Sequence, residues 1–410
     1  MSKIEELIEE LCPEGVEFRQ LSEVTKLAAG DRVTKANMQH DGQFPAYGAG
    51  TVPTGFLNEW NRADSLIFSR AGAGAGYVNF ITGKFWATDV CFVAEQKPEG
   101  PLIKFVFYWM KSNQAELMKK TYGGSMPKID KLFLWRHPVP FPPLELQREI
   151  VSILDKFTQL EAELEAELEA RRIQYEVTRD RLLDFSGDLA GHAPEQKIPN
   201  LRPSGIESLE LSELGELFSG LSGKSKGDFS DGNSPFVSYL DIGNNSSLPR
   251  EIKTKVRVGP QERQNEVRQG DLLFTGSSED REGVGLTAEV EYSPSEPTYL
   301  NSFCFGFRPK EGAFAMGYLK HLFRSTTVRT KVKACSNGVT RINISKKSLV
   351  KIEIPVPPLE VQANIVLILD KLDALVNDIT IGLPAEIAAR RKQYEYYRNK
   401  LLTFKELEAA

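Results

Sequence analysis

The sequence predicts an α+β protein with an internal pseudo-two-fold repeat, in which two mixed, β-rich globular regions are each followed by a long helix. Residues 142–185 are nearly repeated about 215 positions later by residues 357–404. A short opening signature also recurs, because Pro13, Gly15, Leu21, Ser22 and Glu23 return in the same order as Pro203, Gly205, Leu211, Ser212 and Glu213. A duplicated element of this length predicts a molecule built from two equivalent halves.

The duplication sets the predicted domain boundaries. We expect a first globular domain over 1–141, a central long helix over 142–185, a linker over 186–202, a second globular domain over 203–356 and a C-terminal helical region over 357–410. Each globular domain is long enough to bury a core of its own.

The long repeats are predicted to be helices because their apolar residues recur at spacings of four and three. No glycine or proline follows Pro143 before Phe185, whereas Gly382 and Pro384 predict a break in the second copy. Two equal apolar seams favour packing against each other as a coiled coil. The predicted helix-helix packing positions are Leu146, Ile150, Ile153, Phe157, Leu160 and Leu164 in the first copy, and Val361, Ile365, Ile368, Leu372, Leu375 and Ile379 in the second.

The first helix contains a tetrapeptide run, with Leu-Glu-Ala-Glu starting at Leu160 and at Leu164 and Leu-Glu-Ala starting at Leu168. Four residues lengthen a helix by about 6 Å and turn it by about 40°. The run therefore predicts an adjustable spacer. Replication slippage among good helix formers would produce the same pattern.

The two globular regions share one order of predicted elements, with strand-like segments around a glycine-rich turn followed by an amphipathic helix. The strand-like segments begin at Asp64, Lys84, Glu266 and Thr298, and the helices are expected near 102–120 and 315–333. The shared order with little residue identity indicates one fold that carries two different surfaces. Two recognition tasks would require this divergence, and drift on a neutral scaffold would produce it as well.

Composition permits nucleic-acid binding without demanding it. The pI is about 5.7 and the formal net charge is −5, so the chain as a whole has no basic footprint. The first long helix carries 6 basic and 11 acidic residues, whereas 13–141 carries 15 basic and 12 acidic residues and 203–356 carries 20 and 19. The acidic residues thus concentrate on the helix, which leaves the globular regions neutral to slightly basic.

The chain is expected to be cytoplasmic. Its first ten residues lack the basic and apolar regions of a signal peptide, and its apolar runs are shorter than the roughly 20 residues of a membrane helix. Cys12, Cys91, Cys304 and Cys335 are widely spaced, which predicts reduced core cysteines and no zinc site.

Several motifs suggest enzymes, but none forms a convincing active site. Gly223-Lys224-Ser225 resembles the end of a phosphate loop, although Phe218 stands where that loop needs glycine. The alternating glycines from Gly72 to Gly76 favour a hairpin tip over a dinucleotide site.

A metal-dependent nuclease is the main catalytic alternative. Asp241, Glu251 and Lys253 have the spacing of such a site, although similar triplets arise by chance in a highly charged chain. His40, His137, His192 and His321 have no partner at ligand or triad spacing.

The repeated motifs resemble those of the specificity subunits of type I restriction-modification systems. Pro-Pro-Leu-Glu followed by Gln147 or Gln362, the Leu-Asp-Lys motif, and the Gln-Tyr pairs at Gln174 and Gln393 occur twice in the same order. The resemblance covers essentially the whole chain. It implies two target-recognition domains separated by two antiparallel coiled-coil helices, with each domain reading one half of a split double-stranded DNA target.

The resemblance also implies the partners, namely two methyltransferase subunits bound along the helices and restriction subunits in the full complex. It implies no catalysis by this chain. We also expect no cofactor, no metal and no membrane association. Polar and basic residues on loops would then contact phosphates and base edges. The predicted DNA-binding residues are Arg32, Lys35, Tyr47, Arg70, Ser125 and Lys128 in the first domain, and Lys224, Lys226, Arg281, Asn337, Thr340, Arg341 and Asn343 in the second.

Within this set, the residues 125–128 and 340–343 precede their helices by equal distances, which predicts equivalent places against the duplex. A self-contained metal-dependent restriction endonuclease and a coiled-coil scaffold remain the alternative functions. Metal-dependent cleavage by the isolated chain would favour the first, and absence of sequence-specific binding would favour the second.

Overall fold

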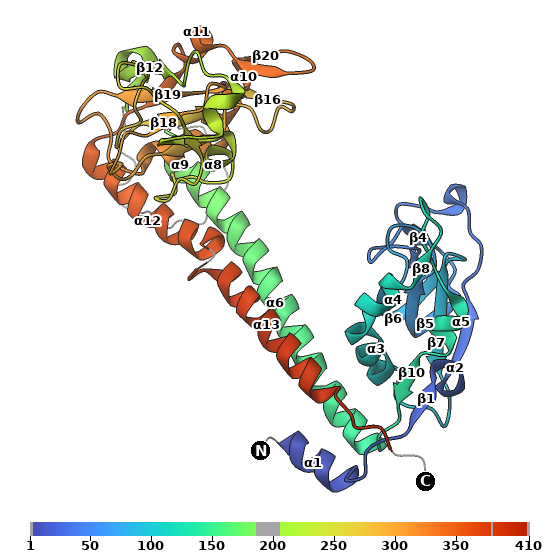
Figure 1. Cartoon of the computed structure of the whole chain (residues 1–410). Coiled ribbons are helices and arrows are strands. Elements are labelled where there is room, and N and C mark those ends of the chain that lie inside the picture. The colour runs from blue at the N-terminus through green and yellow to red at the C-terminus, as the bar shows by residue number, and fades with distance from the viewer. Residues whose placement is uncertain (1–2, 186–205, 379, 408–410) are drawn as a thin grey trace. The chain divides into compact units, whose positions relative to one another are not determined.

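The computed structural model describes residues 3–185, 206–378 and 380–407, and these form two compact units (Figure 1). The first unit comprises Met1–Glu165 with Glu386–Ala410, and the second comprises Ala166–Ala385. The predicted linker 186–202, which contains His192, and the predicted seam residue Ile379 lie outside the described residues. Each unit contains one mixed, β-rich domain and parts of the long helices, which confirms the predicted fold class. Within the described part of the chain, the helices are too short or too polar to span a membrane.

The first domain is built on a six-stranded sheet of order β2-β7-β5-β6-β3-β4, in which only the β3–β6 pair is parallel. Val106 and Met110 of α3 pack on the sheet residues Leu66 and Phe68 to form its core. The elements are α1 (Lys3–Leu11), β1 (Phe18–Gln20), α2 (Leu21–Val24), β2 (Thr25–Ala29), η1 (Lys35–Asn37), β3 (Phe44–Tyr47), β4 (Gly55–Leu57), β5 (Arg62–Ser69), β6 (Val78–Ala87), β7 (Cys91–Gln96), α3 (Ile103–Ser112), α4 (Gln114–Lys119), β8 (Thr121–Tyr122), β9 (Lys128–Ile129), α5 (Lys131–Trp135) and β10 (Pro138–Pro140).

The second domain has the same plan, with its sheet divided in two. A four-stranded sheet has the order β12-β19-β15-β17, and a three-stranded sheet has the order β14-β13-β18 with a parallel β13–β18 pair. The elements are β11 (Ser208–Glu210), α7 (Leu211–Leu214), β12 (Gly215–Ser219), η2 (Lys226–Phe229), β13 (Ser234–Val237), α8 (Tyr239–Gly243), β14 (Lys255–Val256), β15 (Leu272–Thr275), β16 (Ser277–Ser278), β17 (Thr287–Glu289), β18 (Tyr299–Leu300), β19 (Cys304–Pro309), α9 (Tyr318–Arg324), α10 (Thr326–Ala334), β20 (Ser336–Asn337), β21 (Ile342–Ile344), α11 (Lys346–Leu349) and β22 (Glu353–Pro355).

The repeated opening signature forms the same structure in both domains. Leu21 and Leu211 each begin a one-turn helix, and each turn is closed by a capping box whose acidic member is Glu23 or Glu213. The strand before each turn pairs antiparallel with the last strand of its domain, as β1 with β10 and β11 with β22. Each domain is therefore closed by a strand pair immediately before its long helix begins.

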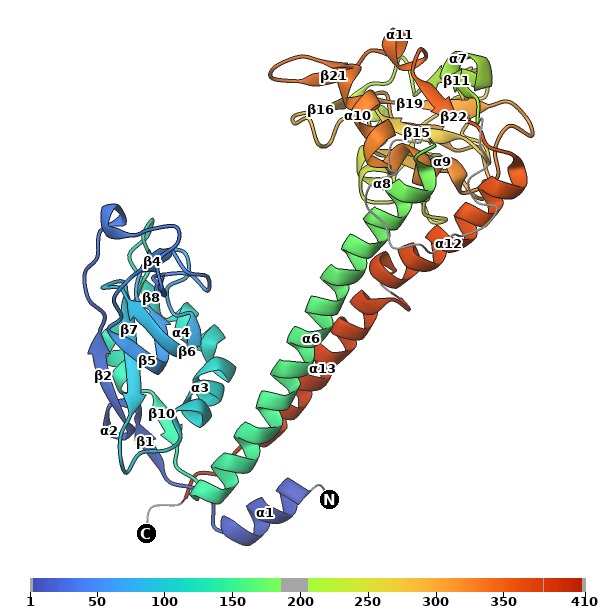
Figure 2. The same cartoon turned by 180° about the vertical axis from the view of Figure 1, so that it is seen from behind.

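The long helices follow the sequence prediction closely. Helix α6 (Leu144–Leu183) runs for 40 residues without interruption, whereas the second copy is divided into α12 (Leu359–Asn377) and α13 (Leu383–Leu401) at the predicted break. In the first unit, Leu401 and Leu402 pack near Leu146, while Arg391 binds the carboxylates of Glu161 and Glu165. Helix α13 therefore runs antiparallel to α6 within this unit (Figure 2).

The two seams are predicted to pack on each other, and within each unit they contact partners that the sequence did not indicate. Leu146 and Ile150 pack with Phe105 of α3 and with Leu401 in the first unit. Val361 and Ile365 pack in the second unit in one cluster with Tyr175 and domain residues. Among the other expected positions, Ile153, Ile368 and Leu372 are partly buried against these clusters. The ring of Phe157 stacks on that of Tyr397, with centroids 5.5 Å apart. Leu164 and Leu375 are half-buried, and Leu160 is exposed. An apolar stripe packs on a globular domain as readily as on a helix, so periodicity alone did not identify the partner.

A buried glutamine joins each helix to its domain. Gln147 donates from Nε2 to the Pro142 carbonyl at 2.8 Å, and its Oε1 accepts from the Leu102 backbone N–H at 2.7 Å. Gln362 makes the same two bonds to the Pro357 carbonyl and to the Ala315 N–H, each at 2.8 Å. The first turn of each long helix is thereby fixed to the start of the segment that leads into α3 or α9.

A carboxylate about two turns further along each helix completes the attachment. Asp155 accepts from Tyr108 Oη at 2.6 Å and from Lys104 Nζ at 2.7 Å. Asp370 is paired with His321 Nε2 and Lys320 Nζ, both at 2.8 Å. We call each set of glutamine and aspartate contacts between a domain and its long helix a joint. The joint of the second domain also includes Tyr175 of α6, whose hydroxyl lies 3.1 Å from His321 Nδ1.

The tautomer of His321 follows from these partners. The pKa of His321 is lowered by burial, and Tyr175 can donate to Nδ1 only if that nitrogen carries no proton. The ring is then neutral, and its Nε2–H donates to Asp370. The repeated Gln, Leu-Asp-Lys and Gln-Tyr motifs thus supply Gln362, Asp370 and Tyr175 to one joint.

Replacing Gln362 with leucine should lower the free energy of unfolding by about 1–3 kcal/mol, because the buried Pro357 carbonyl loses its donor and the partly buried Ala315 N–H loses its acceptor. Urea unfolding of the full chain would measure the change. Glu360→Ala is the matched control, since Glu360 belongs to the same motif but is exposed, and its effect should stay within about 0.5 kcal/mol. Equal losses in the two variants would contradict the role of the glutamine.

Candidate nucleic-acid interface

A short hairpin in the first domain carries residues of one predicted strip. Strands β8 and β9 pair through Tyr122 and Lys128, and a five-residue loop connects them. The segment that follows β5 lies along the other side of β9, where the Ile129 N–H donates to the Arg70 carbonyl at 3.0 Å and the Gly72 N–H donates to the Pro127 carbonyl at 2.9 Å. The hairpin is thus supported by an extension of the central sheet.

The second domain builds the same hairpin from β20 and β21. Asn337 pairs with Asn343, and Ser277 of β16 pairs with Asn343 from the other side. The Ile344 N–H donates to the Gly276 carbonyl at 3.0 Å, which reproduces the bond between Ile129 and Arg70. Strands β16 and β20 project together from one side of their domain (Figures 1 and 2).

The two hairpins match residue by residue. Both turns place a glycine at positive φ, +98° at Gly123 and +122° at Gly338. A Cβ at Gly338 would lie 2.1 Å from the Arg341 carbonyl oxygen, so the turn requires glycine there. After the second strand, Asp130 and Ser345 each accept backbone hydrogen bonds as N-caps of the next short helix. The segments 125–128 and 340–343, which precede their long helices by equal distances, therefore lie at equivalent positions in the two hairpins.

The outer faces of the two hairpins differ. The exposed residues of the first are Tyr122, Ser125, Met126 and Lys128, and those of the second are Asn337, Val339, Thr340, Arg341 and Asn343. Sequence reasoning missed Tyr122, Met126 and Val339, because an apolar residue in a β-rich region suggests core. Val339, at 95% exposed, lies one residue after the turn glycine, and that position was the available signal.

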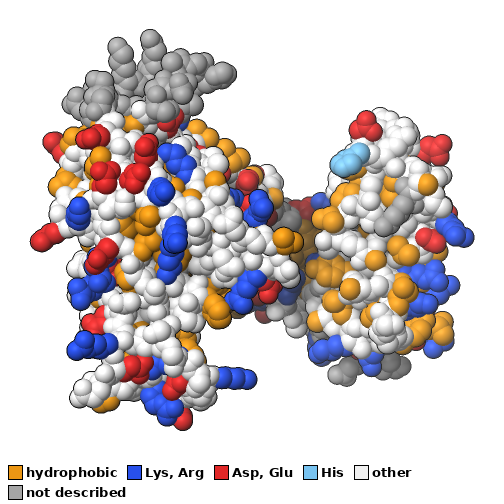
Figure 3. Space-filling model, turned by 90° about the horizontal axis from the view of Figure 1, so that it is seen from above, with side chains coloured by type: hydrophobic (Ala, Val, Ile, Leu, Met, Phe, Trp, Pro, Cys, Tyr) orange, Lys and Arg blue, Asp and Glu red, His pale blue; other side chains and the backbone are white. Residues whose placement is uncertain are grey.

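The sequence segment that contains the second hairpin carries charge of one sign, although in the structure its Lys333 pairs with Glu282 and its Lys320 with Glu291 and Asp370. No aspartate or glutamate occurs from Ala313 to Ile352, and nine lysines and arginines do. On the face drawn in Figure 3, acidic and basic side chains are interspersed, with no single basic field. The acid-free run is therefore a local feature of the second domain, hidden in its overall balance of charge.

Among the remaining candidates of the first domain, Arg70 lies beside the hairpin, where its carbonyl accepts from the Ile129 N–H. Arg70 is exposed, and its Nη1 donates to the Asp89 carbonyl at 3.3 Å. Tyr47 is half-buried against Phe85, with ring centroids 6.0 Å apart, and burial raises the pKa of its hydroxyl. Arg32 is exposed before η1, and the side chain of Lys35 lies outside the described residues.

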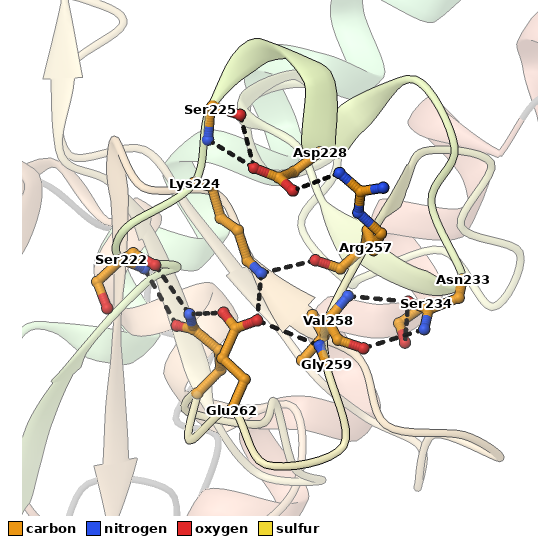
Figure 4. A network of polar contacts seen from close by, with 11 residues as sticks. Ser222, Lys224, Ser225, Asp228, Asn233, Ser234, Arg257, Val258, Gly259 and Glu262 are labelled. Carbon is orange, nitrogen blue, oxygen red and sulfur yellow. Dashed lines mark hydrogen bonds and ion pairs between the residues drawn. The ribbon is translucent and has the colours of Figure 1, made fainter.

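Lys224 is occupied by its own domain. Its ammonium donates to the Arg257 carbonyl at 2.6 Å and to Glu262 at 2.5 Å, and its side chain is only 7% exposed (Figure 4). Asp228 caps the neighbouring turn by accepting from Ser225. Lys226 and Arg281 are exposed, so they are more accessible to a partner than Lys224.

One of the groups considered for catalysis has a structural role. Asp241 caps α8, because its Oδ2 accepts from the backbone N–H and the hydroxyl of Ser238. The described residues contain no group of three metal-ligating side chains placed to hold an ion. The four cysteines are free and buried, as predicted, and burial raises the thiol pKa of Cys91 and of Cys304 to about 12.

Comparison with known proteins identifies the family. The type I restriction modification DNA specificity domain matches twice, over residues 13–170 and 203–389. The chain belongs to the family of type I restriction-modification specificity subunits. The EcoR124I/EcoR124II specificity subunit of Escherichia coli is 30% identical over 98% of this chain and 97% of its own length.

A solved structure shares the fold of this specificity subunit. The S subunit of the type I restriction-modification system from M. genitalium aligns with a TM-score of 0.59 and 18% sequence identity, covering 95% of this chain and 96% of its own. The double match of the domain agrees with the two equivalent halves described above.

Replacing Lys224 with methionine should raise the pKa of Glu262 from about 2 toward its ordinary 4.5, because the hydrogen bond from Lys224 is the largest cause of the lowering. A lowered carboxyl pKa stabilises the fold above pH 4.5, and this contribution is lost as the pH falls through about 2. Carboxyl NMR titration would measure the shift. Lys226→Met is the control and should leave Glu262 unchanged.

Proposed function

We propose that this chain is the non-catalytic DNA-recognition subunit of a type I restriction-modification complex, in which each domain reads one half of a bipartite target. The observation that carries the proposal is the pair of equivalent hairpins, alike in backbone and different in exposed side chains. Two recognition surfaces on one scaffold suit a target with two different halves.

The hairpins have the shape that the task requires. The major groove of B-DNA admits a two-stranded β-ribbon, and side chains on the ribbon can reach base edges. Basic residues beside the hairpin would contact phosphates and set its register. Lys128 in the first domain, and the exposed Arg341 and Lys347 in the second, meet these needs.

The long helices would set the gap between the half-sites. Helix α6 passes through both units without interruption, and its tetrapeptide run contains the boundary between them at Glu165. A change in the number of tetrapeptides would alter the length and rotation of a continuous helix in fixed steps.

The helices would also bind two methyltransferase subunits, with restriction subunits completing the complex. Val177 on α6 and Tyr396 on α13 occupy the same position after the Gln-Tyr motif, and they are 50% and 62% exposed. Exposed apolar side chains at equivalent places in two repeats suit two copies of one partner.

Methylation mapping of source cells should reveal a bipartite motif with two short specific parts separated by unspecified bases. Deleting the gene for this chain should abolish that methylation. A motif without a gap would contradict the division of recognition between the domains. Loss of the gene with no change in methylation would favour a scaffold role.

Deleting residues 164–167 should shorten the gap by one base pair, or at most two, and leave both half-sites unchanged. The deletion removes about 6 Å and rotates the helix by about 40°. A base pair advances about 3.4 Å, with about 10.5 pairs per turn, so one pair matches the rotation and two nearly match the length. We favour one pair. A mismatch in rotation would turn a whole domain away from its groove, whereas bending of the complex can absorb a mismatch of a few ångströms in length.

Methylation mapping of cells with the deletion would measure the gap. A variant with Ala166 and Glu167 exchanged keeps the length and composition and should keep the gap. An unchanged gap after deletion would show that the run has no metric role.

A further inference from the structure

The side chain of Arg341 is exposed, yet it is held at two points. Its Nε donates to Ser277 Oγ at 2.8 Å, and its guanidinium carbon lies 4.5 Å from the centroid of the Phe303 ring. Ser277 is 8% exposed and belongs to β16, which is hydrogen-bonded to the hairpin. An arginine held in this way loses less conformational entropy when its other donors bind a target.

The two Nη groups of Arg341 remain available. In the described ranges 3–185, 206–378 and 380–407, no protein group accepts a hydrogen bond from them, and no carboxylate pairs with the guanidinium. They therefore present two adjacent donors at the outer face of the hairpin. Arg70 differs, because its Nη1 already donates to the Asp89 carbonyl.

The geometry of two adjacent donors selects among the bases. Guanine presents two acceptors, O6 and N7, at its major-groove edge, whereas adenine pairs an acceptor with a donor. Cytosine presents a donor, and thymine presents one acceptor beside a methyl group. A fixed arginine fork is thus complementary to guanine and unfavourable for the other bases.

We infer that Arg341 reads a guanine in the half-site of the second domain, and that Ser277 is the positioning residue that orients its guanidinium. The inference rests on the proposed function. The equivalent residue of the first hairpin is Met126, which has no donor, so this contact belongs to one half-site alone. The segment 313–352 that carries Arg341 contains no carboxylate, although Glu279, Asp280 and Glu282 follow the neighbouring strand β16.

The test is selection of bound sites from a randomised DNA library by the full chain assembled with its methyltransferase. The wild type should select a G·C pair at one position, and Arg341→Gln should lose that selection. The preference for G·C at this position should be about 5- to 150-fold lower in the variant, which is the discrimination expected from one bidentate contact. Every other position in both half-sites should be unchanged. Arg341→Lys should bind DNA but lose most of the preference, because an ammonium has no planar fork.

Two further variants separate positioning from charge. Ser277→Ala should weaken the guanine preference at that same position, and Ser277→Thr, which keeps the hydroxyl, should retain it. Lys347→Gln removes a charge from an exposed lysine of the acid-free run and should reduce binding to all sequences equally. Thermal unfolding midpoints equal to that of the wild type would show that each variant is folded.

An unchanged guanine preference in Arg341→Gln would overturn the inference and leave the bipartite target intact. A uniform loss over all positions would also overturn it, because Arg341 would then contact phosphate. Selection of no bipartite site by the wild type would instead refute the proposed function, and this inference with it.

Discussion

The architecture depends on a buried amide at the start of each long helix. Gln147 and Gln362 each bond one backbone carbonyl before the helix and one backbone N–H of the preceding domain. Both groups would be unpaired in the interior without the glutamine, so the attachment is specific in distance and direction. The domain cannot rotate on its helix without breaking these bonds. Any surface that the domain presents is therefore oriented by the helix.

The carboxylates of the joints show how equivalent attachments can use different chemistry. Asp155 meets a tyrosine and a lysine, whereas Asp370 meets a histidine and a lysine. Tyr108 and His321 each fill the same role, since both donate to the carboxylate from the helix that follows the central sheet. The repeated helix motif supplies the same acceptor, an aspartate, in both halves. The domain supplies the donor, which is a tyrosine in one half and a histidine in the other.

The sequence predicted the features that local rules determine. The break near Gly382 and the uninterrupted α6 follow from glycine and proline, and repeat spacing predicted equivalent places for 125–128 and 340–343, although not their hairpin form. Contacts between distant residues were not predictable in this way. Ser277 and Arg341 are 64 residues apart, and nothing in either segment indicates the other. Lys224 looked available because its partner Glu262 is 38 residues away. The helix partners were missed for the same reason, since an apolar stripe does not specify what covers it.

The ladder of glutamates on α6 gives the chain a particular evolutionary path. Glu161, Glu165 and Glu169 hold the same place in successive tetrapeptides, and Arg391 binds the first two. When one tetrapeptide is lost, Glu169 moves into the place of Glu165, and Arg391 again meets two carboxylates. A single slippage event in the gene thus yields a protein whose helix contact is already formed. Under the proposed function, such a step would change the length of the DNA target while keeping this contact between the two helices.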